Sequence, residues 1–150
     1  MTIRMLLACG LVTGMIGGCA SRMEAPPEAP LDTPVDYQLL AFEATQHVML
    51  HIEPDGTMTR TRMQLPAETA NLDPATLEDI ARKIDDAEFP ALAPTYGCGG
   101  CTDDAVYTVA VQVDGAPYTV RADSTSAIPD RLRPVIDTLR NISELPLDWR

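Results

Sequence analysis

The chain has 150 residues, and 11 Lys and Arg stand against 22 Asp and Glu, so its formal net charge is −11 at pH 7. We do not expect nucleic acid to be a partner, because binding to phosphates requires a basic surface. An acidic surface of this kind favours solubility and cationic partners.

The first 18 residues have the parts of a secretory signal. Arg4 is the only charged side chain ahead of Cys19, and an apolar stretch follows it from Met5 to Ile16. That stretch is too short to span a bilayer, which takes about 20 residues. Gly17 and Gly18 supply the small residues that a signal peptidase requires, so we predict that residues 1–18 are removed.

The run Ile16-Gly17-Gly18-Cys19 resembles the lipobox of a bacterial lipoprotein. The resemblance implies that Cys19 receives a diacylglyceryl thioether and an N-acyl group, and several chains together give a stable anchor. Ala20 follows the cysteine in place of Asp, which resembles the sorting pattern of Gram-negative outer-membrane lipoproteins. We therefore expect a lipid-anchored envelope protein that faces the periplasm; the alternative is an ordinary cleaved signal with an incidental Cys19.

A proline-rich segment separates Cys19 from the rest of the chain. Residues 19–36 contain four prolines and no apolar periodicity. Such a composition predicts an extended tether at about 3.1 Å per residue, roughly 50 Å in all; the alternative is a loop packed on the domain. Residues 37–150 are long enough for a single domain.

The first half of that domain predicts a hairpin and a helix. Residues 37–45 are of mixed polarity and could form a strand, whereas His47–Glu53 alternates as a half-buried strand does. Turn residues 54–56 lead into a second alternating strand that reaches Leu65. Asp73 and Pro74 then open a helix that ends at Pro90.

The second half repeats this order. Residues 105–113 alternate, Asp114-Gly115 is a tight hairpin signal, and residues 118–122 continue the alternation on the return strand. A last helix is predicted over residues 130–142, in which Pro134 must either fall in the first turn or kink the helix. The sequence therefore predicts an α+β fold in the order ββαββα, a four-stranded antiparallel sheet with both helices on one face.

Parts of residues 73–142 resemble emfourin, a small inhibitor of thermolysin-type (M4) metallopeptidases such as protealysin, and its relatives. The similar segments are Ala87-Glu88-Phe89, Tyr107-Thr108-Val109, Tyr118-Thr119-Val120 and residues 129–136. The resemblance implies a non-catalytic, inhibitor-like binding module. That family tends to carry Gly-Gly-Phe in its first hairpin, where this chain has Pro54-Asp55-Gly56. The matched residues are scaffold, which does not transfer function by itself.

Cys98-Gly99-Gly100-Cys101 precedes the second hairpin. In an oxidising envelope a local disulfide is the expected state of the pair. The alternatives are a redox-active dithiol and a metal site. Asp103 and Asp104 follow the pair and disfavour the thiolate that redox chemistry requires.

The remaining polar residues predict neither a metal site nor an enzyme. His47 and His51 would lie about 13 Å apart on one strand, too far to share a metal ion. Asp85-Asp86 and Asp103-Asp104 fit solvated surface, and Ser124 and Ser126 lack the elbow that exposes a nucleophilic serine. We expect no cofactor, no metal and no small-molecule substrate.

One sheet face is the candidate site for a protein partner. Alternation predicts a locally basic, partly apolar face, turned away from the helices, that consists of Met49, His51, Met58, Arg60, Arg62, Thr119 and Arg121. The alternative is an ordinary solvated face. We predict an envelope-anchored lipoprotein with a non-catalytic protein-binding domain, for which the resemblance implies a metallopeptidase-inhibitor-like module. The alternatives are an envelope structural or assembly factor, and a thiol or metal handling protein that uses Cys98 and Cys101.

Overall fold

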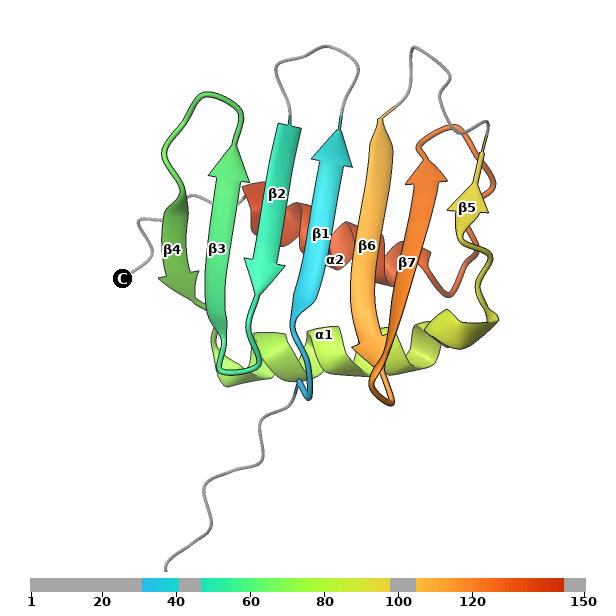
Figure 1. Ribbon diagram of the computed structural model, residues 1–150, viewed down its shortest axis with the longest axis horizontal. Helices are drawn as coiled ribbons and strands as arrows, with labels where there is room; N and C mark the ends of the chain where they lie inside the picture. Colours follow the sequence, from blue (N-terminus) through green and yellow to red (C-terminus); the bar gives the residue numbers. More distant parts are fainter. Residues whose placement is uncertain (1–30, 41–46, 98–104, 145–150) are drawn as a thin grey trace, which may run out of the picture.

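The computed structural model describes residues 31–40, 47–97 and 105–144. Within these ranges seven strands form one sheet, and two helices lie behind it in the view of Figure 1. The elements are β1 (Val35–Leu40), β2 (His47–Ile52), β3 (Thr57–Arg62), β4 (Glu68–Asn71), α1 (Pro74–Ala87), a short 3-10 helix (Phe89–Ala91), β5 (Thr95–Tyr96), β6 (Val106–Val113), β7 (Ala116–Asp123) and α2 (Arg133–Glu144).

The predicted four-stranded antiparallel sheet in the order ββαββα is wrong. The strand order is β4-β3-β2-β1-β6-β7-β5, and the sheet is mixed because β5 runs parallel to β7. The two predicted hairpins, β2–β3 and β6–β7, do form. They do not pair with each other, because β1 lies between them, and β4 and β5 extend the two edges.

β1 lies at the centre of the sheet, and its alternating apolar residues match the buried residues of both neighbouring strands. Val35, Tyr37 and Leu39 are buried on the helix side. Tyr37 lies opposite Leu50 of β2 on one flank and opposite Val109 of β6 on the other. The predicted end of the tether at residue 36 therefore falls inside a central strand, and Leu31 is also buried.

The two hairpin turns differ in length. Asp114 and Gly115 have φ of +52° and +76° and form the two-residue turn expected between β6 and β7. The turn between β2 and β3 has three residues, 54–56. The last pair before it is Glu53 and Thr57, since the backbone N–H of Glu53 donates to the carbonyl of Thr57 at 2.8 Å. Gly56 closes this turn with φ of +90°, a value that glycine adopts without strain.

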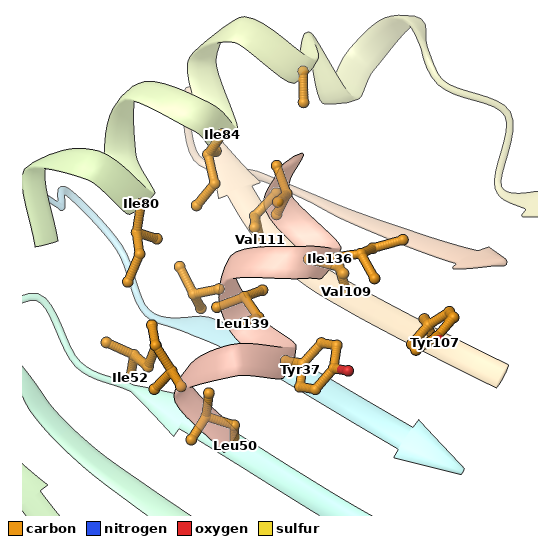
Figure 2. Close-up of a cluster of buried hydrophobic side chains, with 14 of the residues drawn as sticks. Tyr37, Leu50, Ile52, Ile80, Ile84, Tyr107, Val109, Val111, Ile136 and Leu139 are labelled. Atoms are coloured by element: carbon orange, nitrogen blue, oxygen red, sulfur yellow. The ribbon is translucent and has the colours of Figure 1, made fainter. Parts of the chain in front are cut away.

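The core lies between the helices and one face of the sheet, as Figure 2 shows. α1 begins as predicted, with Asp73 accepting a hydrogen bond from the backbone N–H of Thr76 at 3.0 Å and with Pro74 in the first position. Pro134 falls in the first turn of α2, the first of its two expected placements. The helices bury apolar stripes against the sheet, formed by Leu77, Ile80 and Ile84 of α1 and by Val135, Ile136, Leu139 and Ile142 of α2.

Candidate docking surface on the open sheet face

The sheet face opposite the helices is uncovered in the part of the chain that the structure describes (Figure 1). We call it the open face. Threonine is the commonest residue on it. It consists of Asp36, Gln38 and Leu40 of β1, His47, Met49 and His51 of β2, Thr57, Thr59 and Thr61 of β3, Thr108, Ala110 and Gln112 of β6, and Pro117, Thr119 and Arg121 of β7.

A depression of about 400 Å³ lies at the centre of the open face, over β1. We call it the central hollow. Its lining includes the side chains of Asp36, Gln38, Met49, His51, Thr59, Thr61, Thr108 and Ala110. Met49 is 45% exposed although it is a large apolar residue in the middle of a sheet. The volume falls within the range of ligand pockets, roughly 300–1,000 Å³.

His51 links two carboxylates at the rim of the central hollow. It lies opposite Asp36 in the β1–β2 ladder, and its Nδ1–H donates to Asp36 Oδ1 at 2.7 Å. Its Nε2–H donates to Glu53 Oε1 at 3.1 Å. Since both ring nitrogens donate only in the imidazolium form, the hydrogen bonds to Asp36 and then to Glu53 raise the pKa of His51 above its usual 6.5.

His47 lies on the same face with a different partner. The Gln38 side-chain amide donates to His47 Nε2 at 2.8 Å, which keeps that imidazole nitrogen as an acceptor. Each histidine is therefore held by its own neighbour on β1. Among residues 31–40, 47–97 and 105–144, no group of three or more His, Cys, Asp or Glu side chains is placed to hold a metal ion.

The expected composition of the docking face is wrong for three of its residues. Met58 and Arg60 are fully buried on the helix side of β3, and Arg62 faces the same way. The cause is the three-residue turn, which pairs Met49 with Thr61, so that Thr59 and Thr61 face outward in place of the arginines. A turn one residue longer or shorter would reverse the two faces of β3.

Arg60 and Arg62 bind the end of a helix instead of a partner. Arg60 Nη1–H donates to the carbonyl of Ser143 near the C-terminus of α2 at 3.0 Å, and Arg62 Nη2–H donates to the same oxygen at 3.2 Å. Arg60 also pairs with Glu68 of β4, with its Nη2 2.9 Å from Oε2. Positive charge at a helix C-terminus is favourable, so these arginines join the sheet edge to α2.

Met49, His51, Thr119 and Arg121 share the open face as expected. The sequence reasoning missed Asp36, Gln38 and Thr108, which contribute to the central hollow. The signal that could have found the first two was the alternation of buried Val35, Tyr37 and Leu39, which marks residues 35–40 as a strand with its own outward side.

Cys19, Cys98 and Cys101 lie outside the described residues, so the lipid attachment and the disulfide stay predictions. Gly97 and Ala105 are the described residues on either side of the segment that contains Cys98 and Cys101. Gly97 lies against the side chain of Asp123, and the backbone N–H of Ala105 donates to Ser124 Oγ at 3.2 Å. β5 ends and β6 begins at the upper end of the sheet in Figure 1, whereas the β2–β3 turn lies at the lower end, beside α1.

Comparison with protein-family models and with curated proteins finds no match for this chain. The resemblance of residues 73–142 to emfourin therefore stays a prediction. No helix in the described ranges is both long and apolar enough to cross a membrane.

Proposed function

We propose that this protein is a lipid-anchored, non-catalytic binding module of the bacterial cell envelope, and that it docks a protein partner on the open face. The observation that carries the proposal is the one-sided covering of the sheet, with the central hollow and the exposed Met49 on the uncovered side. A concave apolar surface that is surrounded by polar side chains is a common feature of interaction sites.

The anchor belongs to the proposal through the lipobox-like run that ends at Cys19. The chain enters the sheet at the lower end through Val35 (Figure 1). The open face is a broad side of the sheet and not the end at which the chain enters it.

A thermolysin-type metallopeptidase is the partner that the emfourin resemblance suggests. The β2–β3 turn lies at the lower end of the sheet, beside α1 (Figure 1). Gly56 is also buried against α1, which makes that turn part of the scaffold. The open face is therefore the surface through which we expect inhibition to act.

The test uses the soluble chain from Ala20 onward, because a chain that starts at Tyr37 would lack Val35 and Asp36, the first two residues of β1. We expect it to slow a thermolysin-type metallopeptidase from its host, and Met49→Glu to remove the effect. Arg82→Ala on the exposed side of α1 is the matched control, which should inhibit as the unchanged chain does.

A photo-crosslinking residue at position 49 in the anchored protein separates the remaining outcomes. Crosslinking to an envelope protein without inhibition of any metallopeptidase of this class would support an envelope assembly factor and end the inhibitor hypothesis. Full peptidase activity together with no crosslinked partner would overturn the docking proposal itself.

A further inference from the structure

The charge of the central hollow indicates what kind of side chain a partner presents there. This inference rests on the proposed function, since it concerns the occupant of the same surface. Asp36 is the acidic residue of the hollow, and its side chain is 63% exposed. Its Oδ1 accepts from His51, and a carboxylate has further lone pairs on both oxygens for a second donor.

Apolar surface adjoins this carboxylate. Met49 of β2 and Ala110 of β6 lie in the hollow on either side of β1, and the threonines around them add methyl groups. A carboxylate beside a short apolar floor complements a side chain that has an aliphatic stem and a cationic head, as arginine and lysine do.

We propose that the central hollow binds a basic side chain of the partner polypeptide, arginine in preference to lysine, with its stem on Met49 and its head on Asp36. Arginine is favoured because its planar guanidinium donates two parallel hydrogen bonds to one carboxylate. The occupant is therefore a peptide segment that carries an exposed arginine.

The charge of the whole chain favours the same occupant. A net charge of −11 attracts a basic partner and opposes association with a second copy of this chain. Arg60 and Arg62, which could have attracted an acidic partner, face the helix side. Arg121 lies on the open face but outside the lining of the hollow.

His51 competes with the partner for Asp36. The charged groups that face its ring are Asp36 from β1 and Glu53 from the end of β2, while β3 contributes the uncharged Thr59. When His51 is protonated it neutralises one of these two carboxylates, and when it is neutral both negative charges remain. Binding of a basic side chain should therefore strengthen as the pH rises through the titration of His51.

The experiment is an NMR titration of the ¹⁵N-labelled soluble chain from Ala20 with the peptide acetyl-Ala-Arg-Ala-amide. The matched probe replaces arginine by citrulline, which keeps the shape and removes the charge. We expect shift changes at the backbone amides of residues that line the hollow, and an affinity about fivefold higher for the arginine peptide.

Three variants test the assignment. Asp36→Asn should remove the preference for arginine over citrulline, and its dispersed spectrum would show that it still folds. Asp85→Asn is the control, because Asp85 lines a second depression, of about 340 Å³, between α1 and the β6–β7 turn. His51→Gln should abolish the increase of affinity with pH.

Equal affinity for the two peptides, shift changes confined to α1, or dimers of the free chain would each overturn this inference. The proposed function fails separately, through the crosslinking experiment. If Met49 crosslinks a partner while the arginine peptide does not bind, the partner uses other chemistry and only the present inference is lost.

Discussion

Arg60 is the largest fully buried side chain of the described residues, although it carries a charge. It remains inside the protein because Glu68 and the Ser143 carbonyl satisfy its guanidinium. A charge removed from water without such partners would cost several kcal/mol. The three groups come from β3, β4 and α2, so one residue holds three elements together.

Replacement of Arg60 by Ala should therefore lower the free energy of unfolding by about 3 kcal/mol, since it removes the packing of the side chain and the donors to Ser143 and Glu68. Urea denaturation measures the change. Arg62→Ala is the control, because Arg62 is only partly buried and donates a single hydrogen bond to the same Ser143 carbonyl. We expect this variant to lose less than about 1 kcal/mol of unfolding free energy. Equal effects of the two variants would contradict the assigned role of Arg60.

His51 should make stability depend on pH in a defined direction. Its pKa is raised in the folded protein, so its contribution is fully present below the unfolded value of about 6.5. The contribution is lost as the pH rises through the folded pKa. The difference in urea midpoint between the unchanged chain and His51→Gln should shrink over that range. A difference that grows with pH would contradict the imidazolium assignment.

The β2–β3 turn is attached to the start of the first helix. The carbonyl of Gly56 accepts from the backbone N–H of Leu72 at 2.9 Å. A Cβ at position 56 would lie 3.0 Å from Leu77 Cδ1 and 3.1 Å from the Leu72 carbonyl oxygen. The turn residue thus sets how closely the hairpin approaches α1, in addition to supplying a positive φ.

Gly56→Ala should destabilise the protein more than Gly115→Ala does. Both positions have positive φ, which costs an alanine about 1–2 kcal/mol, but a Cβ at position 115 meets no atom within 4 Å. The contacts at position 56 should add about 1 kcal/mol or more. Thermal and urea unfolding of the two variants measures the difference, and equal losses would show that α1 yields to the added methyl group.

The two hairpins and the two helices were predictable from sequence. β1 was not placed in the predicted sheet although it alternates, because its first two residues were assigned to the tether. The two short strands gave no signal. β2, β3, β6 and β7 alternate over six to eight residues, and each helix has a stripe at helical spacing. β4 has only four residues and β5 only two, so neither is long enough for a pattern to form. Their positions depend on neighbouring strands and not on their own residues.

The outward face of β3 was predicted wrongly because it was assigned from charge and not from the length of the turn. Alternation separates Met58 and Arg60 from Thr59 and Thr61, but it does not say which pair faces the helices. That choice depends on the register, and the register depends on how many residues the turn contains. The charge of Arg60 suggested that it faces outward. Arg60 is buried instead, because Glu68 and the Ser143 carbonyl accept hydrogen bonds from its guanidinium.

At the scale of the whole molecule, the segment ahead of Leu31 links the predicted anchor at Cys19 to the described domain. Replacement of Cys19 by Ser should prevent lipid attachment and shift the protein from the membrane pellet to the soluble fraction, or leave it unprocessed. Fractionation and mass measurement of the product test this. The fold should not change, and a fully processed product that stays membrane-bound would contradict the lipoprotein prediction.

The position of β1 has a mechanical consequence. The tether continues directly into this strand, and β1 is hydrogen-bonded on both sides, to β2 and to β6. A pull on the N-terminal end of β1 that is directed along the strand would act at right angles to both rows of hydrogen bonds. Many bonds would then have to shear together instead of opening one by one. The attachment point is thus the part of the sheet that is best suited to resist tension.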